Sequence, residues 1–428
     1  MTVKIHVKDI QYFVLLVLSF PFYMLSRYKL ILLIILILSM SFSPRIPIGE
    51  LAFGRMLELR YEDFVLLIIT ILYFLELFVS KKRIYLSPLT IPIISYISLG
   101  ILSTSLGILM GHIDPLRAFF FMGKEAQYFL IFLISLNLIR NYEDVAIIVY
   151  TLLFCGLING LYGVYQFFSG YFWGYYGISL IGEKGPFPAG GYFSIMFFLS
   201  ISSLYLSNRY NLSKLLSTIA ALFSGLGLIL TGSRANIFAV SLVFFIFVVF
   251  AVGGKYYKIF LVSIFLISII PFNTYLIKKS PEIYLRLTSI EGIKNSLIVR
   301  YELDYKPLVD KVILKNPLIG LGKSILGTDS IPVEAHNHFL RILSEMGIIG
   351  LITFFYLLIT IAQISFKTYK NKNTPFWGRV VSLSSLLSLI SLMIASLTQD
   401  AFAPVRVNEL FWLLVGLTFS INKIIRGE

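Results

Sequence analysis

The stretch SKLLSTIAALFSGLGLILTGSRANIFAVSLVFFIFVVFAV, residues 213–252, holds two long apolar runs separated by the short polar turn TGSR. Each run has close to the ~20 residues that an α-helix needs to cross the hydrocarbon core of a bilayer. Because the runs are continuous rather than alternating, they do not fit the strands of an outer-membrane barrel. The stretch therefore predicts two membrane-crossing helices joined by a tight turn.

The composition of the whole chain agrees with this reading. Of its 428 residues, 57% are hydrophobic and 14% are charged, whereas about a quarter of the residues of a soluble domain are charged. Cys155 is the single cysteine, so the chain can form no internal disulfide and no cysteine-based metal site. No HExxH sequence, Walker loop or nucleic-acid motif is present, which argues against metalloprotease, nucleotide-driven and nucleic-acid-binding functions.

We predict an all-α integral membrane protein with about 12 transmembrane helices. Residues 10–25 are apolar but short and contain Pro21, so they are interpreted as an interfacial or partly inserted helix, with a full crossing as the alternative. The predicted spans lie near residues 29–43, 62–80, 89–110, 116–139, 145–168, 190–207, 213–231, 235–252, 256–272, 346–366, 376–398 and 407–422.

The distribution of basic residues predicts the orientation of the spans. With the N-terminus in the cytoplasm, every predicted inside loop is basic, as the positive-inside rule requires. These basic positions are Lys81-Lys82-Arg83, Arg140, Arg209, Lys214, Lys255, Lys258, Lys367, Lys370, Lys372, Arg379, Lys423 and Arg426. The positive net charge of the chain, +14, is thereby assigned mainly to cytoplasmic anchors.

Four regions follow from this topology. Residues 1–28 form a cytoplasmic N-terminus with the interfacial helix, and residues 29–272 form helices 1–9. Residues 273–345 form a large periplasmic loop domain, and residues 346–428 form helices 10–12 with a cytoplasmic tail. Loops this long between packed elements are usually functional or disordered.

The large loop has its own structural signals. Residues 299–314 and 335–345 look helical, and they are separated by Asn316-Pro317 and the turn Gly320-Leu321-Gly322. Proline and glycine punctuate helices in this way. We therefore expect the loop to fold as a partly helical cap outside the membrane, before helix 10.

The run His336-Asn337-His338 opens the helix that leads into helix 10. A neutral imidazole can accept a proton from a sugar hydroxyl, and a positive helix terminus favours the neutral form. His336 is therefore the candidate catalytic base. The alternative is a histidine that only caps the helix or anchors it at the membrane surface. Further candidates for binding an acceptor or orienting the base are Asn337, His338, Arg341 and Asp400.

Several cations on the outer face are candidates for binding phosphate, because a guanidinium is a planar fork that matches phosphate oxygens. Arg234 sits in the tight turn after residue 230, and Arg300 lies in the large loop. The alternative for Arg234 is a snorkelling membrane anchor. Weaker candidates are Lys184, Arg117 and Lys124, of which the last two could instead form a salt bridge with Glu125 or Asp114.

A metal site is not expected. Glu302 and Asp304 form an acid-x-acid pair, which is a possible metal motif. On a helix, however, residues two apart point in different directions. We expect neither a metal ion nor another cofactor.

The spacing around the histidine resembles a known signature. His336-Asn337 is followed after nine residues by Gly347 and after two more by Gly350, as in O-antigen ligases and the related O-antigen polymerases. The turn 231–234 and the segment from Arg300 to the turn at 316–322 also resemble family segments, in the same order. The chain departs from the pattern at Lys184, where relatives often have arginine, and after Tyr301, where an expected tryptophan is missing.

The resemblance implies a multi-pass protein of the bacterial inner membrane whose active site faces the periplasm. It implies an inverting, metal-independent transfer of a glycan from undecaprenyl pyrophosphate to a sugar hydroxyl of lipid A-core. His336 would then be the general base, and Arg234 and Arg300 would bind the donor pyrophosphate. One alternative within the family is a polymerase, for which the acceptor is a second lipid-linked glycan. Another is a relative that acts on a serine or threonine of a protein, on capsule or on a teichuronic-type polymer.

A flippase or transporter of the lipid-linked glycan remains an alternative from another class. It would also have many spans and buried positive charge. Transporters usually show internal repeats and interrupted helices near the midplane, and neither feature is evident in this sequence.

Overall fold

A computed structural model describes residues 28–51, 55–81, 83–171, 177–183, 185–207, 211–255, 258–263, 289–328, 331 and 333–427. Lys184, the interfacial segment 10–25 and most of the predicted ninth span, 256–272, lie outside these ranges.

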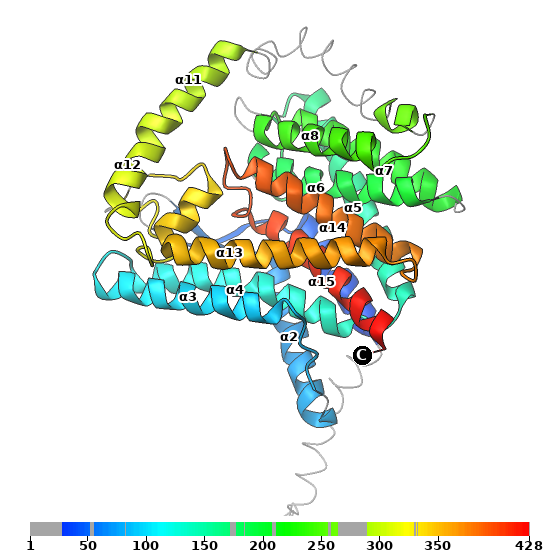
Figure 1. The fold of residues 1–428 in the computed structure, drawn as a ribbon, viewed down its shortest axis with the longest axis horizontal. Coiled ribbons are helices and arrows are strands. Elements are labelled where there is room, and N and C mark those ends of the chain that lie inside the picture. Colours follow the sequence, from blue (N-terminus) through cyan, green and yellow to red (C-terminus); the bar gives the residue numbers. More distant parts are fainter. Residues whose placement is uncertain are drawn as a thin grey trace, which may run out of the picture.

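The described part of the chain is a bundle of apolar helices (Figure 1). Its N-terminal helices are Tyr28–Phe42, α2 (Tyr61–Ser80), α3 (Thr90–Leu109), α4 (Pro115–Leu138), α5 (Tyr142–Ser169), α6 (Pro186–Leu206), α7 (Asn211–Leu230) and α8 (Arg234–Phe250). Its C-terminal helices are α13 (His338–Lys370), α14 (Phe376–Ala395) and α15 (Val405–Arg426). Each predicted span other than the ninth coincides with one of these helices.

The helical membrane architecture is confirmed, but the count of twelve spans is not supported. Eight of the described helices are long and apolar enough to cross a membrane. Helix α8 and the helix Tyr28–Phe42 are apolar but shorter. Helix α15 has the length but carries Arg406, Asn408 and Glu409 in its first turns, which lower its hydropathy.

The core lies where α6, α14 and α15 meet. Helix α6 packs against α7, α14 and α15, and α15 packs in turn against α4. These contacts are close because small residues face each other, as is common between membrane helices. A Cβ atom on Gly416 of α15 would lie 1.8 Å from the Ser135 hydroxyl of α4, so the two backbones are nearly in contact there.

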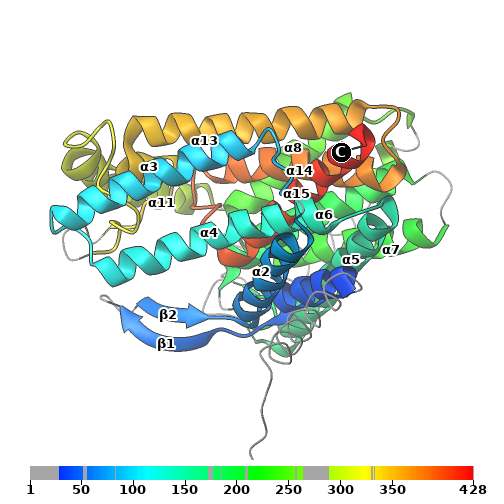
Figure 2. The same ribbon diagram turned by 90° about the horizontal axis from the view of Figure 1, so that it is seen from below.

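A β-hairpin that the sequence did not predict lies between the first helix and α2. Strand β1 (Ile46–Leu51) pairs antiparallel with β2 (Arg55–Leu59) at the edge of the bundle (Figure 2). Pro47 and Gly49 break the alternation that would have indicated a strand, and the ladder is irregular between those two residues.

Buried charges attach the hairpin to the bundle. Arg45 and Arg60, at its two ends, both pair with Glu183, and the Arg60–Glu183 distance is 2.7 Å. The fully buried Arg406 at the start of α15 donates to the carbonyl oxygens of Ser41 and Ile181 at 3.1 and 2.6 Å. The end of the first helix and the segment that holds Ile181 and Glu183 are thereby fixed to α15, and the hairpin is joined to that segment through Glu183.

The described part of the large loop is mostly one helical arm. It consists of α11 (Ile290–Arg300), the π-helical turn η2 (Tyr301–Tyr305), α12 (Lys306–Leu308) and the π-helical turn η3 (Val309–Ile313). Ser289 caps the arm by accepting a hydrogen bond from the Gly292 amide at 3.0 Å. The predicted helix at 299–314 falls within this arm, which begins earlier. Helix α13 starts at His338 and continues past residue 345 into the span.

The glycines of the histidine signature let the loop dock against α13. Gly347 interrupts α13 with a φ of 64° and a ψ of −166°, a combination that is essentially restricted to glycine. The Ile348 amide donates to the Pro317 carbonyl at 2.8 Å, and the Gly322 amide donates to the Glu345 carbonyl at 2.8 Å. A Cβ on Gly347 would lie 2.3 Å from the Leu318 backbone.

We therefore expect Gly347→Ala to destabilise the protein. Backbone strain and overpacking together should cost roughly 2–6 kcal/mol. Gly111→Ala is the matched control, because Gly111 also has a positive φ, 73°, but an added Cβ would meet nothing within 4 Å. The measurement is the thermal unfolding midpoint of each variant in detergent micelles. Equal midpoints for the two variants would show that the 317–322 segment does not constrain α13.

Candidate active site

The start of α13 is held in place by its cap. The Asn337 side chain accepts hydrogen bonds from the amides of Phe339 and Leu340 at 2.9 and 3.1 Å. Its own amide group donates to the Leu397 carbonyl at 3.0 Å, and the His338 amide donates to the Ser396 carbonyl at 3.0 Å. Asn337 is thus an N-cap, which is a preferred role for asparagine, and it fixes the helix start on the 396–404 loop.

His336 precedes this cap in a left-handed conformation, with a φ of 41°. Its side chain is 40% exposed, and its Nε2 lies 3.8 Å from Asp304 Oδ2 and 3.9 Å from Glu334 Oε2. The Tyr305 hydroxyl donates to the His336 carbonyl at 3.1 Å. Burial raises the pKa of Asp304, and the nearby His336 and Arg300 oppose that rise. The imidazole is therefore open to a substrate and lies beside carboxylates that can stabilise its protonated form.

Arg234 and Arg300 lie close enough for their charges to interact. Arg300 donates to the Thr398 carbonyl, while Nη1 of Arg234 is buried with no hydrogen-bond partner in the part of the chain that the structure describes. Within that part, neither arginine forms a salt bridge with a carboxylate. Two neighbouring guanidinium groups that form no salt bridge are well suited to bind a phosphate or pyrophosphate.

Gln399 attaches the Arg234 turn to the same loop. Its Nε2 donates to Asn236 Oδ1 at 2.9 Å, and its Oε1 accepts from the Ser233 hydroxyl at 3.4 Å. Asn236 also donates to the Ser233 hydroxyl oxygen at 2.9 Å. The contacts of Gln399 join two segments that are far apart in the chain, and they could not be read from the sequence.

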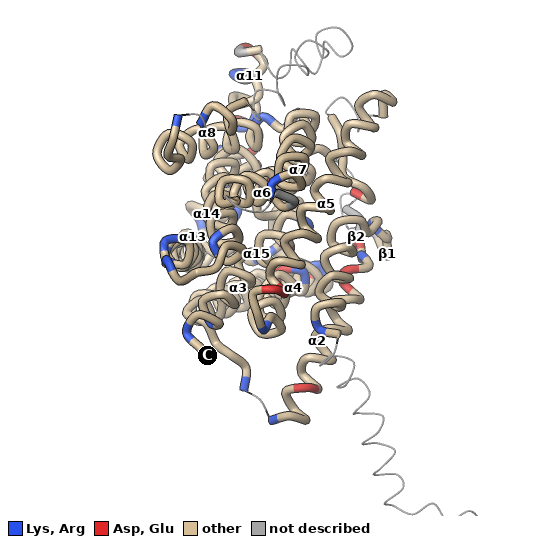
Figure 3. The backbone as a smooth tube through the Cα atoms, turned by 90° about the vertical axis from the view of Figure 1, so that its right-hand side faces the viewer, with Lys and Arg blue, Asp and Glu red and all other residues tan. Residues whose placement is uncertain are grey.

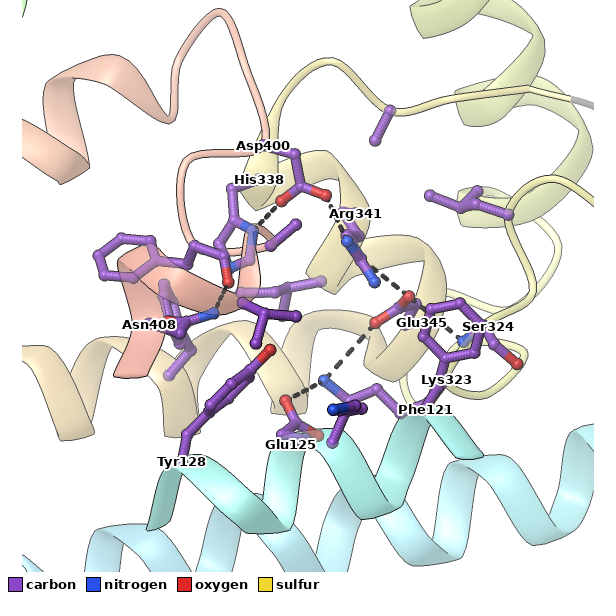
Figure 4. A pocket seen from close by; sticks show the side chains of 18 of the residues that line it. Phe121, Glu125, Tyr128, Lys323, Ser324, His338, Arg341, Glu345, Asp400 and Asn408 are labelled. Carbon is purple, nitrogen blue, oxygen red and sulfur yellow. Dashed lines mark hydrogen bonds and ion pairs between the residues drawn. The ribbon is translucent and has the colours of Figure 1, made fainter. Parts of the chain in front are cut away.

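A row of buried charges begins at the next residue, Asp400 (Figure 4). Asp400 pairs with His338 Nδ1 and with Arg341 Nη1. Arg341 Nε donates to Glu345 at 3.0 Å, and Lys323 Nζ lies 3.5 Å from the other oxygen of Glu345. We call Asp400, His338, Arg341, Glu345 and Lys323 the charge row.

The two ends of the charge row, Asp400 and Lys323, stay ionised near neutral pH. Burial alone would raise the pKa of Asp400, but Arg341 and His338 hold it well below its ordinary value. Burial alone would lower the pKa of Lys323, but Glu125, at 2.9 Å, and other neighbours hold it above its ordinary value. The stabilisation from Asp400 is therefore lost only as pH falls below the ordinary carboxylate range, and that from Lys323 only as pH rises above the ordinary lysine range.

The charge row forms one wall of a pocket of about 440 Å³, a size typical of ligand sites. His336 and Glu334 line it on the side of the large loop. Its other walls are largely aromatic and come from α3, α4, α13, α15 and the 400–405 loop. The aromatic lining residues are Tyr96, Phe120, Phe121, Tyr128, Phe129, Phe354, Phe402, Phe411 and Trp412.

The weaker phosphate candidates have protein partners instead. The buried Arg117 donates to the carbonyl oxygens of Leu326 and Gly327 at 2.7 and 2.8 Å. Lys124 lines the pocket but pairs with Asp63 at 2.5 Å. The structure therefore brings His336, Arg234, Arg300 and Asp400 together and leaves Arg117 and Lys124 apart from the two arginines.

The acid-x-acid pair is also separated. Glu302 lies 3.8 Å from Lys306, whereas Asp304 faces His336. Sequence reasoning missed Asp304 as a partner of the histidine. A usable signal was its spacing from Arg300, since residues four apart share one face of a helix. Lys323 and Gln399 gave no such signal, because their partners are distant in sequence.

We expect Arg341→Met to destabilise the protein by about 3–5 kcal/mol. The substitution removes the cation that Asp400 and Glu345 share and leaves His338 and Lys323 as their remaining partners. Lys306→Met is the control, since the exposed Lys306–Glu302 pair contributes about 0–1 kcal/mol. The thermal unfolding midpoints of the two variants are compared in micelles. If Arg341→Met lowered the midpoint no more than Lys306→Met, the charge row would not be what holds α13 and the 396–404 loop together.

A comparison with known proteins matches the part of the chain that carries several of these residues. Residues 219–355 match the family model Wzy_C, described as O-antigen ligase. No curated protein matches the chain. The matched region runs from α7 through the first half of α13, so it contains Arg234, Arg300, Asp304, Lys323 and His336.

Members of this family are glycosyltransferase-like enzymes of the ligase and polymerase type, and the family implies lipid-linked glycan substrates. Together with the apolar helices, the match makes the chain a multi-pass membrane protein. The resemblance predicted from the histidine signature is thus confirmed over residues 219–355, which match the O-antigen ligase family.

Proposed function

We propose that the protein transfers a glycan from undecaprenyl pyrophosphate to a sugar hydroxyl of lipid A-core, with inversion and without a metal ion. The observation that carries the proposal is the pair Arg234 and Arg300, which forms no salt bridge among the described residues, together with the exposed His336, which like Arg300 lies near Asp304. Cations of this kind can neutralise a pyrophosphate leaving group, and the histidine can activate the nucleophile.

The transfer is a single displacement. The acceptor hydroxyl oxygen attacks the anomeric carbon of the donor, and its proton passes to the unprotonated nitrogen of His336. The bond from the anomeric carbon to the pyrophosphate oxygen breaks, and its electron pair leaves with undecaprenyl pyrophosphate. Arg234 and Arg300 balance the charge of that group, and the imidazolium later releases its proton to solvent. One displacement inverts the anomeric configuration.

His336 is a better base than His338 because of where each ring lies. Nδ1 of His338 is engaged by Asp400, and its ring packs 5.3 Å from both Phe354 and Phe402. His336 is 40% exposed and lines the pocket. His338 and Asp400 are therefore assigned to positioning the start of α13, and Asp304 and Glu334 to stabilising the protonated His336.

The orientation of the helices supports an active site on the periplasmic face of the inner membrane. Helices α8, α13 and α15 begin beside the site, at Arg234, His338 and Val405. The last turns of α13 and α15 carry Lys367, Lys370, Lys423 and Arg426. Basic residues favour the cytoplasmic side, so the ends that carry the site are assigned to the periplasm.

We expect His336→Ala to lower the rate of transfer by about 10²–10⁴-fold, the usual contribution of a general base. The assay mixes purified protein with undecaprenyl-pyrophosphate glycan and lipid A-core in the presence of EDTA and without nucleotide. Transfer is read on a gel as carbohydrate shifting onto the core lipid. His112→Ala is the control, because His112 lies outside the site in the bend after α3.

Three other outcomes of this assay would each contradict part of the proposed function. Lengthening of the donor glycan without labelling of the core lipid would identify a polymerase that uses the same residues. Undiminished transfer by His336→Ala would remove the histidine from the chemistry. If no acceptor became labelled, transport of the lipid-linked glycan would become the better account, with the arginines as ligand clamps.

A further inference from the structure

The pocket differs in charge from the neighbouring arginine pair. Each of its four cationic lining residues is already paired with a carboxylate. The pairs are Arg60–Glu183 at 2.7 Å, Lys124–Asp63 at 2.5 Å, Lys323–Glu125 at 2.9 Å and Arg341–Glu345 at 3.0 Å. No lining cation is therefore left over to balance the charge of a phosphate or a sugar acid.

Carboxylates also outnumber cations in the lining. They are Glu58, Glu125, Glu334, Glu345 and Asp400. An anionic ligand in this partly enclosed space would lie near these groups at reduced dielectric, where like charges repel more strongly than in water. The pocket thus disfavours phosphorylated and acidic sugars, although the site next to it is suited to pyrophosphate.

The pocket does offer neutral hydrogen-bonding groups that the protein leaves unused. The Tyr128 hydroxyl points into it (Figure 4) and has no hydrogen bond within the described ranges. The Ser324 hydroxyl, which belongs to another lining residue, is buried and likewise has no partner there. Buried hydroxyl groups normally have a partner, so a ligand that supplies hydroxyl groups would satisfy them.

The aromatic walls of the pocket also suit a sugar. The ring centroids of Trp412 and Phe129 lie 4.8 Å apart, and those of Phe402 and Phe354 lie 5.7 Å apart. A pyranose ring has apolar C–H faces that suit such walls and a rim of hydroxyl groups that suit Tyr128 and Ser324. A ligand with apolar faces and neutral polar edges fits both features of the pocket.

We infer that this pocket binds the acceptor sugar and that the sugar it selects is uncharged. This inference rests on the proposed function, because His336 both lines the pocket and faces the large loop that carries Arg300. A hydroxyl of a sugar in the pocket would approach His336 from the side of the charge row. The donor pyrophosphate would bind to the arginine pair. The charged donor and the uncharged acceptor would then bind at different places, because the two sites differ in charge.

The test measures binding without any transfer. The chain has three tryptophans, and the double variant Trp173→Phe/Trp377→Phe leaves Trp412 in the pocket wall as the fluorescent reporter. The full-length protein is titrated in micelles with a neutral oligosaccharide prepared from dephosphorylated lipid A-core, and with the matched phosphorylated oligosaccharide. We expect the neutral probe to bind at least about tenfold more tightly.

One further substitution in the Trp173→Phe/Trp377→Phe protein tests the Tyr128 hydroxyl, and a second serves as its control. Tyr128→Phe should weaken binding of the neutral probe by about 3–10-fold, the contribution of one hydrogen bond. Tyr165→Phe is the control, since Tyr165 is 58% exposed on α5 and does not line the pocket. An unchanged affinity in Tyr128→Phe, or equal or tighter binding of the phosphorylated probe, would overturn the inference.

A competition experiment tests whether the pocket and the arginine pair are distinct binding sites. Undecaprenyl pyrophosphate without a glycan should leave the Trp412 signal of the neutral probe unchanged, and displacement of the probe would overturn the inference. Because no donor glycan is needed, this binding can be measured whether or not the protein transfers a glycan. Neutral-probe binding by a protein that fails to transfer would uphold the pocket and reject the transfer.

Discussion

Three consecutive residues, Thr398, Gln399 and Asp400, hold the site together. The Thr398 carbonyl accepts from Arg300, Gln399 binds Asn236 in the Arg234 turn, and Asp400 binds His338 and Arg341. The large loop, the α7–α8 turn and the start of α13 therefore depend on one short loop between α14 and α15. A displacement of this loop would move both arginines relative to the histidine, and small displacements of catalytic groups are costly.

The charge row and the arginine pair use the same kinds of charged residue for different purposes. The charge row is made of paired ions, so removing one partner would leave an uncompensated charge in the pocket wall. The arginine pair forms no salt bridge among the described residues, which leaves its positive charge available to a ligand. The same residue types therefore serve as structure in one place and as a binding site in the other, and pairing is what distinguishes them.

The sequence predicted the span positions because membrane thickness fixes the length of an apolar run. It also predicted that His336, Arg234 and Arg300 share one face, because the order of the spans sets the side of the membrane on which each loop lies. It could not predict the hairpin at 46–59, since Pro47 and Gly49 hide the strand pattern, or the partners of Lys124 and Lys323. Those pairs join residues far apart in the chain, and no local periodicity encodes them.

The central claim is that the two arginines bind the pyrophosphate of the donor. It is tested most directly by ³¹P NMR of undecaprenyl pyrophosphate added to the purified protein in micelles. The wild type and a Lys323→Met variant should shift or broaden both phosphorus resonances, while Arg234→Gln/Arg300→Gln should leave them as in empty micelles. Unchanged binding by the double arginine variant, or loss of binding in Lys323→Met alone, would contradict the claim and move the anion site to the pocket.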